Sequence, residues 1–418
     1  MTTDNNLPAK TGFWQRLTLL SRHLLARIIL AMCLGIGAAY IFPLWTVRIF
    51  ETFNAIFSQL LGFVIPLIIL GFVAAAIAEV GKKAGKMLLA TVVIAYTATL
   101  CAGFGSYLVS DAIFPAIVQP LNGNIAAVAG EASTKLEPYF TIEMPALMSV
   151  MTALITAFVI GIGSASFNAD SAIRQLLNEF RTIVTGLISK VVIPLLPIYI
   201  FGIFLNMTVA GQVAGIMQTF ASIIAVIFAM HIVVLLFQFT IAAFFSRGSR
   251  NPLRLLGTMM PAYFTALGTQ SSAATIPVTL RQTIKMGVAP ETAGFTVPLC
   301  ATIHMSGSVM KIVACSVALM LATGIPYDFE MFTGFIFMLG ITIVAAPGIP
   351  GGAIMASLGL LTSMLGFNDA DCALMIAIYI AMDSFGTACN VTGDGALAII
   401  IHRLFGSKTQ PTESTSAS

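Results

Sequence analysis

Long apolar stretches separated by short polar ones set the pattern of this chain. Before residue 246 the apolar stretches cover 24–45, 53–79, 87–116, 145–166, 183–209 and 215–245. Each is long enough to cross a bilayer as a helix, which takes about 20 residues. Polar connections lie at 79–86 and 170–181, and the longest hydrophilic loop is 117–144. A polar lead-in, 1–22, precedes these spans, and a Ser/Thr-rich tail, 406–418, is predicted to be disordered.

Beyond residue 245, two apolar stretches are broken in the middle. The first, 258–278, is interrupted at 271–277, and the second, 340–361, is interrupted at 347–352. Each half is too short to span a bilayer, so we expect two re-entrant helical hairpins with irregular tips buried in protein or facing a cavity. Two kinked spanning helices are the alternative, but they would break the charge alternation described below. Paired interrupted segments indicate the binding site of a transporter built from inverted repeats.

Two further apolar segments carry polar groups in their interiors. Segment 295–323 is interrupted at 304–308, where a Ser-Gly-Ser sequence is expected to unwind and expose carbonyl oxygens to a cation. Segment 377–401 is predicted to be one spanning helix. Residues on a single face of this helix are Asp383, Thr387, Asn390 and Asp394. Because a carboxylate in hydrocarbon is costly unless it faces protein, water or a cation, this face marks a candidate site, with a water-filled vestibule as the alternative.

Composition and charge place the chain in a membrane. The 418 residues are 58% hydrophobic and 9% charged, which indicates a polytopic protein of the lipid bilayer and excludes a soluble globular one. With the N-terminus in the cytoplasm, only Arg48 and Lys135 of the 20 Lys and Arg residues fall in outer segments, and Lys190 and Lys311 lie within apolar spans. This bias predicts a multi-pass protein of the cytoplasmic membrane with both termini cytoplasmic. The 6 cysteines show no paired spacing, so we expect neither disulfides nor a metal cluster.

Two other functional classes use residues of the same types. Asp383 and Asp394 suggest an intramembrane aspartyl protease, but a continuous helix would separate them by about 16 Å, too far to share a proton. His304 with Ser306 or Ser308 suggests a serine protease, but no second element positions a base. A bare channel is disfavoured because kinked hairpin tips are typical of gates around an occluded site. We therefore expect a carrier and not an enzyme.

Four motifs in order resemble one known family. They are SSAATIPVT, PLCATIHMSGS, APGIPGGAIM and DSFGTACNVTGD, and with the preceding spans they cover nearly the whole chain. They are similar to the motifs of the glutamate-transporter family, the dicarboxylate/amino acid:cation symporters, and the Asn-Val-Thr-Gly-Asp ending is highly specific. The resemblance implies an all-α membrane protein with eight transmembrane helices, two re-entrant hairpins and inverted repeats. It also implies a homotrimer that works by an elevator mechanism.

The family's division into a scaffold and a moving transport domain carries over to this chain. Residues 23–245 would form mainly the scaffold and the first transmembrane helices. Helices 87–116 and 215–245 within that range would belong to the transport domain. Residues 246–405 would form the core of the transport domain, with both hairpins, a broken seventh helix and a polar eighth helix.

The resemblance also assigns roles to single residues. Asp383 matches the carboxylate that binds the ammonium group of an amino-acid substrate. Other substrate ligands and the outer gate match Ser271, Ser272, Ser308, Gly348, Ile349, Thr387 and Asn390. The ligands of two sodium sites match Asn390, Asp394, Cys300, His304, Thr302 and Met305. Independently of the resemblance, a zwitterion needs an anion for its ammonium group, which Asp383 supplies. Its carboxylate needs donors, which the helix and hairpin N-termini with their hydroxyls and amides supply.

Several positions depart from the family's pattern. The arginine that binds an acidic side chain would fall at Gly386, and Ser306 replaces the aspartate of a third sodium site. Lys311 stands where a tyrosine-like residue is usual. We expect Lys311 either to replace the arginine missing at Gly386 or to act as a built-in cation near the lost sodium site, with a snorkelling lysine as the third option. His304 stands at a sodium-ligand position, so coupling to sodium and coupling to protons through His304 both stay open.

Together these features predict a secondary active symporter that imports a small amino acid. The coupling ion is sodium or a proton, and neither a cofactor nor a nucleic-acid partner is expected. A C4-dicarboxylate is the alternative substrate, but Asp383 would repel it. We expect Asp383 to be unpaired in the absence of substrate, a cation to be coupled at Asp394, and fewer than three sodium ions per substrate.

Overall fold

Every element of regular secondary structure in the part that the computed structural model describes is a helix, and that part is residues 24–80, 86–118, 136–168, 170–210, 213–246, 250–344, 346 and 351–405. Within these residues, 6 helical stretches are long and apolar enough to cross a membrane. They are Leu44–Ala75, Lys86–Ile117, Ala172–Val209, Ala221–Phe245, Pro290–Thr323 and Asp383–Phe405. Large apolar side chains such as Tyr40, Val159 and Phe244 point outward, where a bilayer would cover them. The molecule is therefore an all-α polytopic membrane protein.

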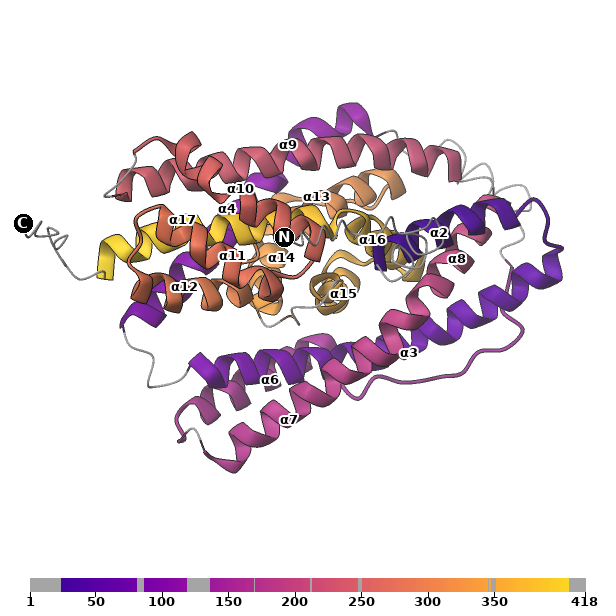
Figure 1. Cartoon of the computed structure of the whole chain (residues 1–418). Coiled ribbons are helices and arrows are strands. Elements are labelled where there is room, and N and C mark those ends of the chain that lie inside the picture. The colour runs from indigo at the N-terminus through magenta and orange to yellow at the C-terminus, as the bar shows by residue number, and fades with distance from the viewer. Residues whose placement is uncertain are drawn as a thin grey trace, which may run out of the picture.

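One group of helices comes from the N-terminal half and lies along the lower and right part of Figure 1. Its members are α2 (Leu24–Ala38), α3 (Leu44–Val80), α6 (Val150–Ala165), α7 (Ala172–Leu187) and α8 (Ile193–Val209). Helix α3 packs against α6, α7 and α8, and α2 packs against α8. Glycines permit the closest approaches, since a Cβ on Gly161 would lie 2.7 Å from the Cβ of Ile77. We refer to this set as the N-terminal group.

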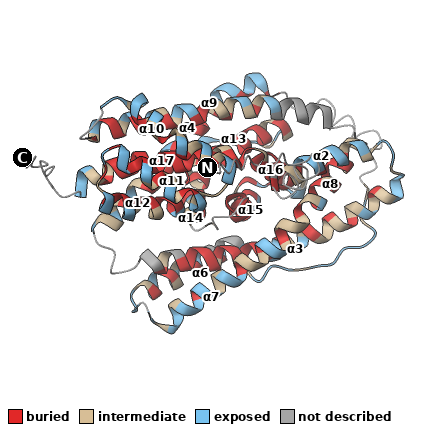
Figure 2. Cartoon of the chain, viewed as in Figure 1, coloured by how far each residue is buried: buried red, intermediate tan, exposed pale blue. Residues whose placement is uncertain are grey.

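The remaining helices form a second, larger group, which we call the C-terminal group (Figure 1). Its members are α4 (Lys86–Ile117), α9 (Val213–Phe245), α10 (Pro252–Thr269), α11 (Ser272–Lys285), α12 (Pro290–Ile303), α13 (Ser306–Thr323), α14 (Phe329–Val344), α15 (Gly352–Leu365), α16 (Asp369–Ala381) and α17 (Asp383–Phe405). Helix α17 packs against α4, α9, α10, α11, α12, α13 and α16, and both α13 and α17 are buried along most of their length (Figure 2). Polar side chains on these two helices are therefore enclosed by protein. The assignment of the groups to a scaffold and a transport domain stays a prediction.

The two broken apolar segments form helix pairs. Helices α10 and α11 pack against each other, as do α14 and α15. The first break is shorter than the predicted 271–277, because it is confined to Gln270 and Ser271 and the following residues begin α11. Gln270 takes the left-handed conformation, with φ 54°, and the Ser271 side chain then caps α11 by accepting from the Ala274 N–H. The second tip falls largely in residues outside those described.

The break in segment 295–323 is also shorter than predicted. Helix α12 ends at Ile303 and α13 starts at Ser306, so the Ser-Gly-Ser sequence is helical and the irregular backbone is confined to His304 and Met305. Side chains from neighbouring helices supply the acceptors that this break needs. The Met305 N–H donates to Thr99 Oγ1 at 3.3 Å, and the Gly307 N–H donates to Asn390 Oδ1 at 2.7 Å. Because these donors are satisfied, α13 can begin two residues after α12 ends.

Two further predictions about helices were wrong. Segment 377–401 is not one helix, because α16 ends at Ala381 and α17 begins at Asp383, with Met382 between them outside helical geometry. The polar connection predicted at 170–181 does not separate α7 from the span after it, because α7 begins at Ala172 and continues through a π-helical turn (η1, Ile188–Val192) into α8. Leu177 and Val184 bury one face of α7, which explains how a sequence rich in polar residues stays helical.

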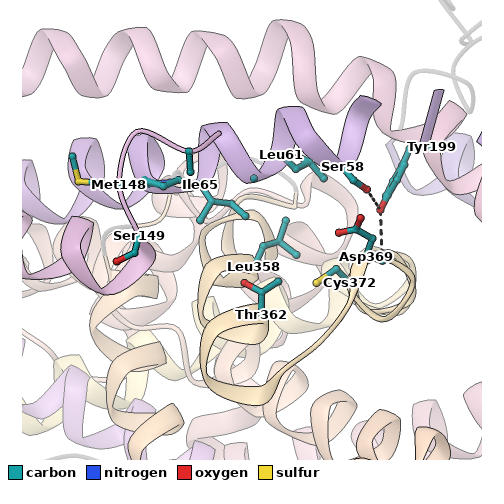
Figure 3. A pocket seen from close by; sticks show the side chains of 13 residues that line it. Ser58, Leu61, Ile65, Met148, Ser149, Tyr199, Leu358, Thr362, Asp369 and Cys372 are labelled. Carbon is teal, nitrogen blue, oxygen red and sulfur yellow. Dashed lines mark hydrogen bonds between the residues drawn. The ribbon is translucent and has the colours of Figure 1, made fainter. Parts of the chain in front are cut away.

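A cavity of about 200 Å³ separates the two groups at one point (Figure 3). Its lining includes Ser58 of α3, Tyr199 of α8 and Asp369 of α16. The Tyr199 hydroxyl lies 3.2 Å from Ser58 Oγ and donates to the Asp369 carbonyl oxygen at 3.2 Å. One buried tyrosine therefore links the N-terminal group to the C-terminal group.

Candidate functional site

A small cavity lies where α17 meets the first hairpin tip, the α12–α13 break and the start of α15. Its lining residues are Gln270, Ser272, Met305, Ser308, Ala346, Gly352, Ala353, Tyr379, Asp383, Thr387 and Asn390. The structure thus brings together five residues that the sequence assigned to substrate binding, namely Ser272, Ser308, Asp383, Thr387 and Asn390. The cavity of about 30 Å³ has room for about two water molecules, so its walls must move apart to admit a larger ligand.

Asp383 begins α17 and supplies the carboxylate of this cavity. Its Oδ2 accepts from the Gly351 N–H at 2.9 Å, and its Oδ1 accepts from Lys311 Nζ at 3.5 Å. The expectation that Asp383 is unpaired without substrate was therefore wrong. The pairing was hidden in the sequence because Lys311 and Asp383 are far apart along the chain and meet only where α13 packs against α16 and α17.

Lys311 is fully buried, with 0% of its surface exposed. Besides Asp383, its ammonium donates to the Met382 carbonyl oxygen at 3.2 Å and lies 3.7 Å from the centre of the Tyr379 ring. A carbonyl, a carboxylate and an aromatic face together compensate the buried charge. Lys311 also lies against Gly386, and it does not snorkel to an interface. Lys311 is not among the residues that line the cavity, so its two predicted roles, replacement of the arginine missing at Gly386 and a built-in cation, both stay predictions.

Asn390 links the cavity to the start of α13. Its Oδ1 accepts from the Gly307 N–H, while its Nδ2 donates to Ser308 Oγ at 3.1 Å and faces Met305 Sδ at 3.5 Å. The Tyr379 hydroxyl donates to the same Ser308 Oγ at 3.1 Å. These bonds hold the amide and the hydroxyls in fixed orientations at the cavity wall.

The first hairpin presents the N-terminus of α11 to the cavity. Ser272 is the first residue of α11 and lines the cavity, whereas Ser271 caps the helix and is absent from the cavity lining given above. The first N–H groups of a helix have no intrahelical acceptor and carry a partial positive charge. This end of α11 is suited to a carboxylate group.

A second polar cluster surrounds Asp394, which lies further along α17 than Asp383. Asp394 Oδ1 lies 2.9 Å from His304 Nδ1, and His304 Nε2 lies 2.6 Å from Ser306 Oγ. Gln238 of α9 donates to Ser306 Oγ at 3.0 Å. All four side chains are buried. The order Asp-His-Ser matches a hydrolase triad, but Ser306 is 0% exposed and already bonded, so no substrate has access to its hydroxyl.

The residues predicted to bind sodium lie at the end of α12, in the break that follows it and on α17. The His304 ring contacts Asp394 Oδ1 through its Nδ1. The Cys300 carbonyl oxygen accepts from the backbone N–H of His304 at 2.8 Å. The other carboxylate oxygen, Asp394 Oδ2, is buried and has no hydrogen-bond partner among the described residues, so the imidazole bonds only one oxygen of this carboxylate. At the end of α12, the last carbonyl groups have no intrahelical donor, and the Met305 and Gly307 N–H groups that follow donate to side chains of other helices. Free carbonyl oxygens at a helix C-terminus, close to Met305, do fit a hard cation.

Some site residues escaped the sequence analysis, and some predicted ones cannot be placed. Tyr379 and Gln270 line the cavity but were not predicted. Tyr379 lies four residues before Asp383, so on the single helix predicted for 377–401 this spacing already placed it on the same face as Asp383. Gln270 gave no signal, since its left-handed backbone is visible only in the structure. Gly348 and Ile349 lie outside the described residues, so their gate role stays a prediction.

Comparisons with known proteins agree with this picture. A family model described as the sodium:dicarboxylate symporter family matches residues 24–404. Proteins of Acinetobacter baumannii strains ATCC 17978 and AYE, each called serine/threonine transporter SstT, are 27% identical over 395 residues, covering 91% of this chain and 96% of the relative. The SstT of Acinetobacter baumannii strain SDF is 26% identical over the same length. The chain therefore belongs to the sodium:dicarboxylate symporter family.

Proposed function

We propose that this protein is a secondary active symporter that imports a small neutral amino acid, such as serine or threonine. The observation that carries the proposal is the cavity itself. Among the described residues that line it, Asp383 is the only charged one, and its neighbours are mainly hydroxyls and amides. Lys311 lies behind Asp383, out of the lining, so an acidic side chain would find no cation there. A C4-dicarboxylate would lie against the Asp383 carboxylate.

The proposed binding mode uses groups on three elements. The ammonium of the amino acid binds Asp383 at the start of α17. The carboxylate binds the N-terminus of α11 at Ser272, with Thr387 and the Asn390 amide as further donors. A hydroxyl on the substrate's side chain forms a hydrogen bond with Ser308 or Tyr379. Every one of these residues lines the same cavity, which supports the arrangement.

For the coupling ion we propose sodium at the C-terminal end of α12, with carbonyl oxygens near Thr302 and Met305 as ligands. The His304–Asp394 pair argues against a second sodium ion at Asp394, and Ser306 in place of an aspartate argues against a third. The carrier would then move fewer than three sodium ions per substrate. A reversal-potential measurement in liposomes that gave three would contradict this stoichiometry.

The proposed architecture follows the family's pattern. Eight transmembrane helices and two re-entrant hairpins would divide into an N-terminal scaffold and a transport domain that moves as an elevator. Within the scaffold range of 23–245, helix α4 packs with the C-terminal group, as does α9, which supports their place in the transport domain. We further propose a homotrimer in the cytoplasmic membrane with both termini in the cytoplasm.

Ligand binding to the purified full chain tests the function directly. Thermal stability is measured with each of the twenty amino acids and with succinate, in sodium and in potassium at the same ionic strength. A ligand at one hundred times its Kd stabilises the folded state by about 2.7 kcal/mol. We expect stabilisation by serine and threonine that is larger in sodium. Stabilisation by succinate or aspartate alone would favour the dicarboxylate alternative.

A further inference from the structure

Lys311 is a cationic side chain buried inside an apolar helix. It is 0% exposed, and its ammonium contacts the Met382 carbonyl, the Asp383 carboxylate and the Tyr379 ring. Met382 and Tyr379 belong to the last turn of α16 and the residue after it, where the helix dipole is negative. An ammonium held by three such groups is fixed in place and is part of the site's electrostatics.

The chain is shaped to accept this lysine. A Cβ built on Gly386 would lie 2.5 Å from both Cε and Nζ of Lys311, a distance that real Cβ contacts do not reach. Any side chain at 386 would therefore displace the ammonium from Asp383. The position of the Lys311 ammonium thus depends on residue 386 being glycine.

Lys311 acts on the cavity through Asp383. The carboxylate lines the cavity, and the ammonium approaches Oδ1 from the side of α13 without lining the cavity itself. The Gly351 N–H holds Oδ2. Asp383 thus presents an oriented carboxylate whose negative charge is balanced from behind, and the net charge of the pair is zero.

We infer that Lys311 is a specificity-determining positioning residue, which balances Asp383 so that the site accepts zwitterions and rejects amines that lack a carboxylate. The inference rests on the proposed amino-acid transport. A zwitterion adds no net charge to the neutral pair, whereas an amine leaves one uncompensated positive charge in a closed cavity, at a high desolvation cost. Without Lys311 the preference between the two ligands reverses, because the positive charge of the amine then neutralises the Asp383 carboxylate.

The test compares two ligands that differ only in the carboxylate. Serine and ethanolamine share an ammonium and a hydroxyl, and their affinities for the purified full chain are measured by titration calorimetry. The variants are Lys311→Leu, which removes the charge, and Lys311→Gln, which keeps a donor for the Met382 carbonyl and serves if the leucine variant does not fold. Lys190→Leu is the control, since Lys190 is an exposed lysine of η1, far from the cavity in sequence.

Wild type and Lys190→Leu should bind serine and bind ethanolamine weakly or not at all. Both Lys311 variants should shift the ratio of the two affinities toward ethanolamine by at least about tenfold, as expected for loss of one charge near the site. An unchanged ratio, with or without a common loss of affinity, overturns the inference, because a merely structural role would weaken both ligands alike. If wild type binds no amino acid at all, the proposed function fails first and the inference fails with it.

Discussion

At the scale of single residues, the site is organised by two internal pairs. Asp383 is paired with Lys311 at 3.5 Å, and Asp394 is paired with His304 at 2.9 Å. Both carboxylates were predicted from the polar face of α17, because aspartates in an apolar helix are too costly to be accidental. Their partners were not predicted, because both come from the region of the α12–α13 break and reach α17 only through tertiary packing.

The Asp383 carboxylate should dominate substrate affinity. Asp383→Asn keeps the size of the side chain but removes the charge and leaves Lys311 without its anion. We expect amino-acid binding to weaken by about 2–5 kcal/mol, the range for breaking a buried, hydrogen-bonded charge pair. Calorimetry on the purified variant measures the loss. The exposed Asp369→Asn, at the start of α16, is the matched control and should bind as wild type does.

His304 should limit the use of sodium at Asp394. His304→Asn shortens the side chain and frees Asp394 Oδ1, which leaves a buried carboxylate in need of a cation. We therefore expect sodium to raise the thermal stability of this variant more than that of wild type, with potassium at equal ionic strength as the reference. Equal responses of the two proteins to sodium would mean that Asp394 is not a latent sodium ligand.

At the scale of elements, the functional features are breaks between helices. The sequence indicated three interrupted segments correctly, because clusters of Gly, Pro and small polar residues leave backbone groups that a spanning helix in lipid cannot satisfy without neighbouring protein. The positions of the breaks were less predictable. Ser306 to Ser308 are helical because Asn390 and Thr99 satisfy backbone donors at the start of α13, and such caps from distant helices leave no local signal. The break at Met382 was missed because the distant group that bonds its carbonyl oxygen, the Lys311 ammonium, likewise leaves no local signal.

The cap from Asn390 should contribute measurably to stability even without substrate. Asn390→Ala removes the acceptor of the buried Gly307 N–H and the donor to Ser308 Oγ. An unsatisfied buried donor costs about 1–3 kcal/mol, so the substrate-free variant should unfold at a lower temperature. Thr392→Val is the control two residues on, since the Thr392 hydroxyl is buried and has no partner among the described residues. Equal melting temperatures for the two variants would argue against the cap.

At the scale of the whole molecule, two helix groups meet across a partly open interface. The membrane class and the family were predictable from hydropathy, charge bias and motifs that span most of the chain. The interface between the two groups was not predictable, because its cavity depends on how α3 and α8 pack against α15 and α16. If the C-terminal group moves as an elevator, contacts across this interface must break in each cycle.

The hydrogen bond from Tyr199 to the Asp369 carbonyl is one such contact. Tyr199→Phe removes it and keeps the packing of the ring. A neutral hydrogen bond contributes about 0.5–1.5 kcal/mol, so the rate of transport should change several-fold while the substrate Kd stays the same. Initial rates in liposomes and calorimetry separate the two quantities. A changed Kd with an unchanged rate would contradict a role for this contact in the motion.

The most direct test of the central claim is uptake of labelled serine by liposomes that contain the purified protein. With an inward sodium gradient, serine should accumulate inside above its outside concentration, and an ionophore that dissipates the gradient should release it. Excess unlabelled threonine should compete. Serine that only equilibrates under every sodium gradient, or that accumulates under a proton gradient alone, would contradict sodium-coupled import of a small neutral amino acid.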